Sequence, residues 1–425
     1  MKKRKMIMRR IVAVLLALVM IGSAVDMSGV TVHAEETVVD SGFCGAEGDG
    51  TNLTWQVTEN GETYTLTISG TGAMADSAPW YGFRNEITTV IIDEGVTSIA
   101  PGAFYYFEVL KGISIPSGVT SIGSQAFAYC RALETVSIPL GVTNIGERAF
   151  DNCTSLTSVV LPEGVESIGV CSFASCTSLE TINFPSTITS IGISAFDNCD
   201  ALASVVLPEG VTSVGKLAFR NCNALETVSI PSSLTNIPDS MFENCTSLAN
   251  VTISKGVTSI GWTAFSGCDA LTSVIIPEGV TSIGRYAFAD NDLLAEITIP
   301  SSVENIGYDA FARCPNLQTV HVPCNWDTEN PLYDFGNINV QNSGCDSTNR
   351  VYVAKGATLT GTCGACNKDE GSLTLVSPSG LTYDGNEKQA TITGSINGVE
   401  NPTITYNTTD GSAPIYPGNY TTGFS

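Results

Sequence analysis

Phenylalanine recurs every 23 residues along most of this chain, and that spacing limits the possible folds more than any other feature of the sequence. Ten of the 16 phenylalanines share one phase without a slip. These ten are Phe104, Phe127, Phe150, Phe173, Phe196, Phe219, Phe242, Phe265, Phe288 and Phe311. A fixed period of roughly 20 to 50 residues is typical of repeat architectures, in which each repeat buries its apolar side against its neighbours. We therefore expect a stack of ten short coils.

Each repeat reads L-x-x-V-x-I-P-x-G-V-T-S-I-G-x-x-A-F-x-x-C, as in residues 133–153. The L-x-x-V-x-I part alternates like a short strand, which the proline ends, and V-T-S-I is a second short extended run. The glycine that follows, Gly146 in this copy, suits a sharp corner with unusual backbone angles. In A-F-x-x-C the apolar residues lie three apart, which predicts a single helical turn. The fold class is thus a mainly β repeat solenoid with short strands and single helical turns.

This phrase resembles the BspA-like class of leucine-rich repeat, a 23-residue variant found in bacterial surface proteins, over residues 81–323. The resemblance implies a right-handed arc with a concave parallel sheet. It also implies roles in adhesion or host contact, because some relatives bind extracellular-matrix proteins. Residues 35–80 look like the N-terminal lead-in of that class. We expect two or three strands there that cap the first coil, since an open solenoid end exposes both core and strand edge.

The first 34 residues have the features of a secretory signal peptide. A basic start that includes Lys2 and Arg10 precedes an apolar stretch from Ile11 to Ala24, which is short for a membrane span. Cleavage is expected after Ala34, with Ala24 as the second candidate and an uncleaved anchor helix as the alternative. We expect the mature protein to be exported and either free or associated with the cell surface, with no further segment that crosses a membrane.

The 23-residue period is gone at the C-terminal end of the chain. Residues 324–370 form a cysteine-containing linker or C-terminal cap, and residues 371–425 are rich in Thr, Asn, Gly and Tyr. Strands are expected at 373–376, 389–393 and 403–406. Together with Leu381–Gly385 and Pro417–Tyr420, this last segment resembles a bacterial immunoglobulin-like or MBG-type module. About 55 residues is short for a closed sandwich, so the module would be incomplete.

Eight of the 14 cysteines share one phase, three residues after the repeat phenylalanine. They are Cys130, Cys153, Cys176, Cys199, Cys222, Cys245, Cys268 and Cys314. Disulfides between coils are one interpretation. The other, which we favour, is a seam of small buried thiols, because the unbroken run to Cys268 has seven members and would leave one unpaired.

Four more cysteines, at 324, 345, 363 and 366, lie beyond the last coil. A zinc site built from His321, Cys324, Cys363 and Cys366 can be drawn, since Cys363 and Cys366 form a C-x-x-C pair. Local disulfides and free thiols are the alternatives for these cysteines. Only one C-x-x-C is present, so we favour free thiols and assign neither a metal nor a cofactor.

Charge and histidine content exclude several functions. The formal net charge is -23, which disfavours nucleic acids and anionic membranes as partners. The two histidines are His33, inside the signal segment, and His321, so a Ser-His-Asp triad would depend on His321 alone. A glycosidase needs two facing carboxylates, yet Glu163, Glu209 and Glu278 recur at one phase, which indicates a solvated turn. We therefore expect no catalytic activity.

The most distinctive surface signal lies three residues before the repeat phenylalanine. On three consecutive coils that position holds Trp262, Arg285 and Tyr308, with Tyr286 beside them. Such an aromatic and basic patch favours sugars or protein partners, although packing between neighbouring turns explains it equally well. We expect a monomeric adhesion protein that binds surface proteins or glycans of a host or a neighbouring cell. The alternative is a structural stalk that displays other modules.

Overall fold

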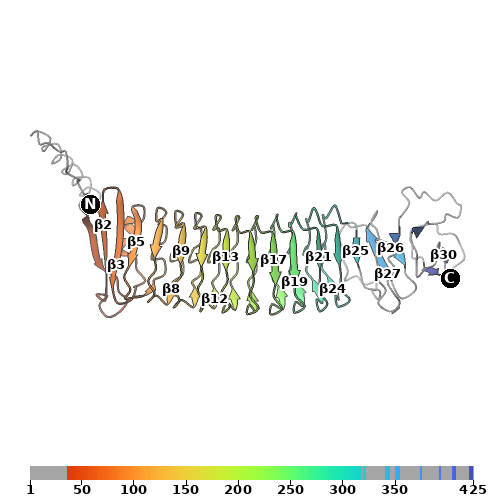
Figure 1. Cartoon of the computed structure of the whole chain (residues 1–425), viewed down its shortest axis with the longest axis horizontal. Coiled ribbons are helices and arrows are strands. Elements are labelled where there is room, and N and C mark those ends of the chain that lie inside the picture. Colours follow the sequence, from red (N-terminus) through yellow and green to blue (C-terminus); the bar gives the residue numbers. More distant parts are fainter. Residues whose placement is uncertain are drawn as a thin grey trace, which may run out of the picture. The chain divides into compact units, whose positions relative to one another are not determined.

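The computed structural model describes residues 36–317 in full and, beyond them, only the backbone of several short strands (Figure 1). The predicted signal peptide, residues 1–34, lies outside this part. So do the side chains of the zinc candidates His321, Cys324, Cys363 and Cys366. The coils belong to one compact unit, Val38–Ser425.

The described residues form a β solenoid of about 11 turns, ten of which contain two short strands. The first strand of each coil is one of β5(Ile87–Ile92), β7(Gly112–Ser114), β9(Thr135–Ser137), β11(Ser158–Val160), β13(Thr181–Asn183), β15(Ser204–Val206), β17(Thr227–Ile230), β19(Asn250–Ile253), β21(Ser273–Ile275), β23(Glu296–Thr298) and β25(Thr319–His321). The second is one of β6(Val96–Ile99), β8(Ser121–Ile122), β10(Asn144–Ile145), β12(Ser167–Ile168), β14(Ser190–Ile191), β16(Ser213–Val214), β18(Asn236–Ile237), β20(Ser259–Ile260), β22(Ser282–Ile283) and β24(Asn305–Ile306). This architecture confirms the predicted repeat solenoid.

Strands on consecutive coils pair in parallel, one full repeat apart. Val159 of β11 lies opposite Val136 of β9 and Ile182 of β13, so the pairing register equals the sequence period. Ile168 of β12 pairs with Ile145 in the same way. Because side chains alternate across a strand, Val159 is buried while its neighbour Val160 is exposed. The register therefore keeps every inward position of one coil over the same position of the next.

The repeat phenylalanines form the stacked centre of the core. All ten are fully buried, and rings on consecutive coils lie 5.1 to 5.7 Å apart with interplanar angles of 1° to 14°. Phe150 and Phe173, for example, stack at 5.3 Å. Each ring covers the face of the next, so no coil could bury its own phenylalanine alone.

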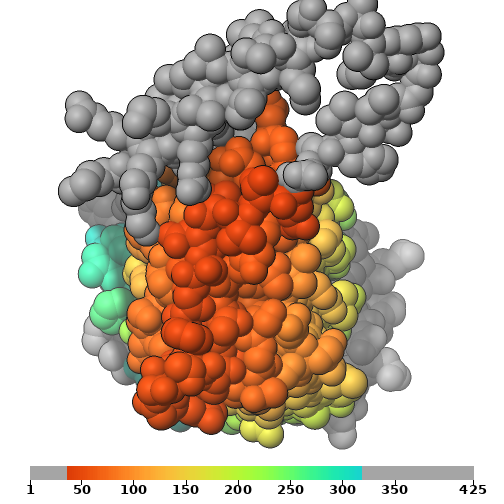
Figure 2. Space-filling view, turned by 90° about the vertical axis from the view of Figure 1, so that its left-hand side faces the viewer, coloured from red at the N-terminus to blue at the C-terminus, as the bar shows by residue number. Residues whose placement is uncertain are grey.

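Three strands of seven or eight residues precede the first coil: β1(Thr37–Phe43), β2(Leu53–Asn60) and β3(Thr63–Gly70). The last two pair antiparallel, and β3 pairs in parallel with β5, so the first sheet runs β1-β2-β3-β5-β7. The short strand β4(Gly72–Ala73) begins the second sheet beside β6. Figure 2 looks onto the atoms of this N-terminal part, coloured red and orange, with the yellow coils behind them. The capping role of these strands stays a prediction.

A short 3₁₀ helix, η1(Pro79–Phe83), extends the aromatic stack towards the N-terminus. Its Trp80 is buried and stacks on Phe104 at 6.1 Å, while the indole N–H donates to the carbonyl of Ala103 at 2.8 Å. Trp55 of β2 meets Trp80 edge-on at 6.1 Å. The N-terminal strands therefore share one core with the coils.

The single helical turn predicted for A-F-x-x-C is wrong, because η1 is the one helix among the described residues. The segment is a run of tight turns. In the second coil the amide of Cys130 donates to the carbonyl of Phe127 at 3.1 Å, with Tyr129 between them at φ 64°. The amides of Gln125, Phe127 and Tyr129 donate to the next coil at 2.8, 2.8 and 2.7 Å. A helix would use those amides within its own coil.

The glycine after the second strand is also explained differently from the prediction. Gly192 does not adopt the left-handed backbone conformation that would require a glycine. Its place is set by close approach, because a Cβ there would lie 2.5 Å from the carbonyl carbon of Gly169 on the preceding coil. The same crowding holds at this phase in the other coils that carry the glycine, such as Gly146 and Gly284. The glycine therefore allows two backbones to stack closely.

The eight in-phase cysteines are free, buried thiols, which confirms the thiol seam and excludes disulfides between coils in this structure. Each thiol donates to the carbonyl oxygen of the phenylalanine on the preceding coil, at 3.1 to 3.3 Å. Cys222, for example, reaches the carbonyl of Phe196 at 3.3 Å. A small side chain with a weak donor suits this position, because it fills the seam and satisfies a buried carbonyl.

Asn291 takes the cysteine position in one coil, and replacing it with cysteine is expected to stabilise the solenoid. Its amide nitrogen donates to the carbonyls of Phe265 and Phe288 at 3.0 and 2.7 Å, but its buried Oδ1 has no hydrogen-bond partner. Removing an unpaired buried acceptor is worth about 1 to 2 kcal/mol. Urea unfolding of Asn291→Cys should therefore show a higher midpoint. The exposed Asn183→Cys is the control, and a lower midpoint for Asn291→Cys would contradict this explanation of the seam.

Beyond β25 the structure describes three separate antiparallel strand pairs. They are β26(Val340–Gly344) with β27(Arg350–Ala354), β28(Thr374–Leu375) with β29(Ile392–Thr393), and β30(Ile404–Asn407) with β31(Thr421–Phe424). Three of these strands overlap the strands predicted at 373–376, 389–393 and 403–406. Two backbone pairs within residues 371–425 do not establish a sandwich, so the immunoglobulin-like module stays a prediction.

Candidate functional site

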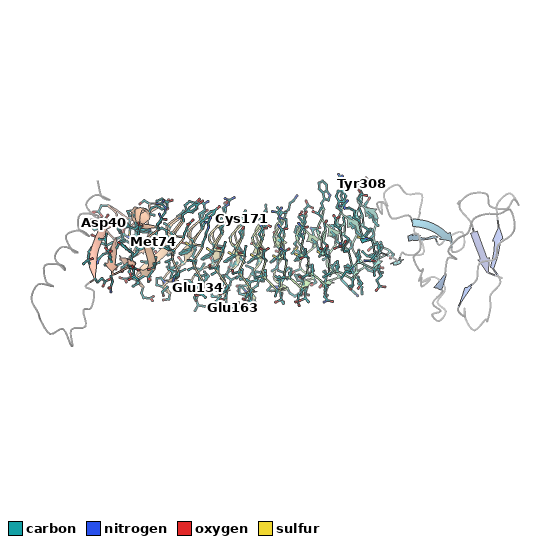
Figure 3. The ribbon with its side chains drawn as sticks, turned by 90° about the horizontal axis from the view of Figure 1, so that it is seen from above. Asp40, Met74, Glu134, Glu163, Cys171 and Tyr308 are labelled. Atoms are coloured by element: carbon teal, nitrogen blue, oxygen red, sulfur yellow. The ribbon has the colours of Figure 1, made fainter. Side chains whose placement is uncertain are left out.

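The structure brings the four residues of the predicted patch together on the turn side of the coils. Trp262, Arg285 and Tyr308 each follow a two-residue strand and its glycine, after β20, β22 and β24 respectively. Trp262 is 64% exposed and Tyr308 57% exposed (Tyr308 is labelled in Figure 3). Because equivalent positions stack coil over coil, three neighbouring coils present these side chains in one row.

Arg285 lies among the tyrosines of the patch. Its guanidinium carbon is 4.8 Å from the ring centre of Tyr286 and 5.2 Å from that of Tyr308, within cation–π range. It also donates to the hydroxyl of Tyr286 at 3.2 Å, and the two tyrosine rings meet edge-on at 6.2 Å. The hydrogen bond to Tyr286 raises the pKa of Arg285, so the guanidinium keeps its charge. These contacts hold the arginine and both rings in one arrangement.

A groove of about 400 Å³ runs beside the patch, and we call it the flank groove. It is lined by Lys216, Leu217, Asp239, Ser240, Trp262, Thr263, Arg285 and Tyr286. These are the residues three and two places before the phenylalanine on four consecutive coils. The volume falls within the range of about 300 to 1,000 Å³ that is usual for small-molecule sites. Lys216 and Asp239 occupy the same repeat position as Trp262, three residues before the phenylalanine, whereas Ser240 and Thr263 are common turn residues that carried no signal in the sequence.

The polar groups of the flank groove bind one another. Lys216 Nζ lies 2.7 Å from Asp239 Oδ2, and Asp239 Oδ1 accepts the backbone N–H of Trp262 at 3.0 Å. Burial raises the pKa of Asp239, but the hydrogen bonds from Lys216 and Trp262 outweigh it, and the pKa lies below its ordinary value. The hydroxyls of Ser240 and Thr263 are 2.7 Å apart. The donors and acceptors along this wall are therefore ordered before a ligand arrives.

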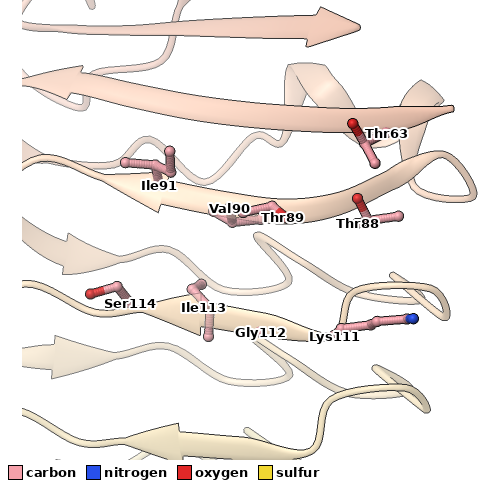
Figure 4. A pocket seen from close by; sticks show the side chains of 9 residues that line it. All are labelled: Thr63, Thr88, Thr89, Val90, Ile91, Lys111, Gly112, Ile113 and Ser114. Carbon is pink, nitrogen blue, oxygen red and sulfur yellow. The ribbon is translucent and has the colours of Figure 1, made fainter. Parts of the chain in front are cut away.

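A second groove, of about 430 Å³, lies on the face of the first sheet over β3, β5 and β7 (Figure 4). Its lining includes Thr63, Thr89, Ile91, Lys111 and Ser114. The residues that line it are mostly short and uncharged, with one lysine and no carboxylate or aromatic side chain. This groove has fewer groups for specific recognition than the flank groove.

The third residue of the first strand on each coil forms an exposed column, which holds no aromatic anchor from Ser114 to Thr298. Its large members are Val160, Val206 and Ile275, which are 63%, 71% and 75% exposed. They stand on separate coils between short polar side chains such as Ser229. Isolated aliphatic residues of this kind are common on protein surfaces.

The glutamates that recur at one phase hold neighbouring coils together. Glu209 accepts hydrogen bonds from the amide and the hydroxyl of Ser232, at 3.1 and 2.8 Å. Glu163, labelled in Figure 3, bonds Ser186 in the same way at 3.2 and 2.9 Å. Each carboxylate bridges to the next coil instead of facing a second carboxylate. This arrangement gives the glutamates a structural role in the turn.

The predicted zinc site lies outside the residues whose side chains the structure describes. Within residues 36–317, no cluster of three or more His, Cys, Asp or Glu side chains is arranged to hold a metal ion. In the same part of the chain, no helix has the length and apolar character needed to span a bilayer.

The chain belongs to the family described as the BspA type leucine-rich repeat region. That family matches residues 80–203, 171–293 and 212–339, in six copies, and these ranges together span more than half of the chain. The match agrees with the repeat phrase read from the sequence. No protein among those with curated function matches the chain.

Several solved structures are similar to this chain. A leucine-rich repeat protein from Bacteroides ovatus has 24% identity and a TM-score of 0.40, covering 64% of this chain and 93% of its own. A leucine-rich cell surface protein from Faecalibacterium prausnitzii has 28% identity and a TM-score of 0.38, covering 67% and 95%. The leucine-rich repeat protein of T. pallidum has 26% identity and a TM-score of 0.36, covering 53% and 90%.

Proposed function

We propose that this chain is a non-catalytic binding protein of a bacterial cell surface, exported by means of residues 1–34. Its flank groove would hold a protein or a glycan of a host or a neighbouring cell. The observation that carries the proposal is the row of exposed aromatic side chains beside ordered polar groups, formed by Trp262, Arg285 and Tyr308 with Tyr286. Aromatic and arginine side chains are the usual anchors of binding surfaces.

Exposure of Trp262 supports a binding role over a packing role. The position is filled elsewhere by small, aliphatic or charged residues, such as Ser124, Val170 and Ile193, so the fold does not require an aromatic ring there. At 64% exposure the indole contributes little to the core. A large apolar side chain left in water gains free energy when a partner covers it.

A cell-surface location is supported by the family, and the F. prausnitzii relative is itself described as a cell surface protein. The signal-like start of the chain, with its basic and apolar segments, agrees with export. Residues 371–425, if they form the immunoglobulin-like module, would be a second displayed unit on the same chain.

The second candidate function is a structural stalk. One observation favours it: the coils are nearly identical, and inter-coil contacts such as the Glu209–Ser232 bonds recur along the stack. A stalk needs this regularity and needs no ligand. The two functions differ in whether the flank groove binds anything.

Replacing Trp262 with alanine is expected to weaken ligand binding without weakening the fold. Binding would be measured on an array of extracellular-matrix proteins and bacterial and host glycans, then quantified for any ligand found. Loss of an aromatic anchor should lower affinity about tenfold or more. Since the indole is mostly exposed, the urea midpoint should not change.

Ile193→Ala is the matched control, because Ile193 occupies the same position of its coil, is 47% exposed and lies outside the groove. It should bind like the parent protein. If a ligand binds Trp262→Ala as tightly as it binds the parent protein, its binding site lies outside the flank groove. If no member of the array binds, the structural stalk is the remaining candidate function.

A further inference from the structure

The flank groove follows the solenoid axis. Its lining comes from two adjacent residues on each of four consecutive coils. The first residue of each pair is Lys216, Asp239, Trp262 or Arg285. The step from one coil to the next is fixed by core stacking, and the rings of Phe265 and Phe288 below the groove lie 5.3 Å apart. Equivalent groups along the groove therefore recur at about this interval, and Tyr308 adds a fifth coil to the row.

We propose that the flank groove binds a linear, neutral β-1,4-linked polysaccharide that lies along the solenoid axis with one sugar over each coil. This inference deepens the proposed function and rests on it. An extended β-1,4-linked pyranose chain advances by nearly the coil step at each sugar, because its linkages are equatorial. An α-1,4-linked chain curls instead and leaves the axis after a few sugars.

The spacing of the aromatic side chains fits this ligand. In a β-1,4-linked chain each ring is turned over relative to the next, so the same face returns at every second sugar. Trp262 and Tyr308 stand two coils apart and are both more than half exposed. The ring of Trp262 and the face of Tyr308 that Arg285 does not cover can therefore meet the same face of two alternate sugars, as aromatic platforms do for apolar C–H faces. The intervening coil carries the exposed Arg285, whose remaining N–H groups would donate to hydroxyls at the edge of the sugar between them.

The charge of the groove favours a neutral ligand. Lys216 is paired with Asp239 at 2.7 Å, so this end of the groove carries no net charge. The hydrogen bond to Tyr286 is the main cause of the raised pKa of Arg285, and the nearby negative charge of Asp309 is a smaller one. The whole chain has a formal charge of -23, which would repel a polyanionic glycan. Paired charges and the hydroxyls of Ser240 and Thr263 suit sugar hydroxyls, which both donate and accept.

The test is calorimetric titration of the full chain with cello-oligosaccharides and chito-oligosaccharides of two to six sugars, and with maltohexaose as the α-linked comparison. Affinity should rise with each added sugar until the coils of the groove and Tyr308 are covered, and then level off. Cellohexaose or chitohexaose should bind about tenfold or more tightly than maltohexaose. The two β-linked series differ in an acetamido group and show which neutral sugar is preferred.

Variants make the test specific to the groove. Trp262→Ala and Tyr308→Ala should each lower the affinity for the β-linked hexamer about tenfold, while Ile193→Ala leaves it unchanged. Equal affinity for β-linked and α-linked hexamers, or no dependence on length, would overturn the inference. If an array protein binds and depends on Trp262 while no glycan does, the proposed function stands and this inference fails. If nothing binds, both fail.

Discussion

Raising the pH to about 10 in the presence of a reducing agent is expected to unfold the solenoid, with a steep loss of stability that begins near pH 9. The cause is the seam of eight buried thiols. Burial raises the pKa of Cys245 to about 12 and that of Cys314 to about 11, and it raises the pKa values of the other six above the ordinary 9.0. In the folded protein these groups therefore stay protonated in mild alkali.

The direction of the effect follows from proton binding. In the unfolded chain the thiols lose their protons near pH 9, so above that pH the unfolded state binds fewer protons than the folded state and is favoured by further alkali. Each thiol costs about 1.4 kcal/mol per pH unit, so eight cost about 11 kcal/mol by pH 10. That loss matches the whole stability of an ordinary domain, about 5 to 15 kcal/mol. Below about pH 8 the thiols should contribute no pH dependence.

Urea unfolding at a series of pH values between 7 and 10.5, followed by circular dichroism, would measure this slope. The control is a double variant, Cys222→Ala with Cys245→Ala, in which two of the eight thiols are missing. It should be less stable near neutral pH, and its alkaline slope should fall by about a quarter. An identical slope in both proteins would show that the thiols do not control alkaline unfolding.

Gly192→Ala is expected to destabilise the solenoid by about 3 kcal/mol. The added Cβ would lie 2.5 and 2.6 Å from the carbonyl carbon and oxygen of Gly169, and 2.6 Å from the amide nitrogen of Val170. All three atoms belong to the backbone of the preceding coil, so no side chain can rotate to make room. The two coils must separate, which weakens the hydrogen bonds and the ring stacking between them.

Gly112→Ala provides the comparison for this prediction. Gly112 lies in β7 with nothing within 4 Å of an added Cβ and no left-handed backbone angle. Alanine there should be neutral or slightly stabilising, because glycine loses more conformational freedom on folding. The midpoints of urea unfolding of Gly192→Ala and Gly112→Ala measure this difference in stability. Equal midpoints would mean that close approach of the coils does not explain the repeat glycine.

The period of the sequence predicted the core because in-register stacking repeats every contact. Once Phe150 and Phe173 occupy equivalent places on adjacent coils, their rings must meet, and the same holds for Cys153 and Cys176. The free thiols could also be inferred, since parallel side chains and an odd run argue against pairing. Each of these two features depends only on the spacing of a single residue type, phenylalanine for the stacked rings and cysteine for the thiols.

Local spacing could not distinguish a helical turn from the tight turns that the structure shows. Ala126, Phe127 and Cys130 have the same spacing in both, and all three are buried. The deciding interactions are hydrogen bonds to the next coil, such as that from Phe127 to the carbonyl of Ala149 at 2.8 Å. Such bonds join different coils, so the spacing of residues within one coil does not reveal them. The glycine was misread for the same reason, because its close neighbour is 23 residues away.

The candidate site was partly predictable. Reading one phase of the repeat down the coils singled out Trp262, Arg285 and Tyr308, because two aromatic residues and an arginine follow one another there on consecutive coils. The flank groove itself was not visible in the sequence. It depends on Ser240 and Thr263, ordinary turn residues whose position beside Trp262 is set by the stacking of coils. The recurring spacing of the glutamates was likewise visible in the sequence. Its structural reason, the bond from Ser232 to Glu209 on the preceding coil, could be recognised only once the coils were paired.

Deletion of one whole coil tests most directly the claim that each coil supplies the apolar surface its neighbour lacks. Removing residues 188–210 takes out one 23-residue period and joins Thr187 to Val211, which occupy successive places of the same repeat phrase. This variant should keep the β-type circular dichroism spectrum and unfold cooperatively, with a modest loss of stability. Removing the 20 residues 191–210 breaks the register and should abolish cooperative unfolding. Equal damage from the two deletions would contradict the account.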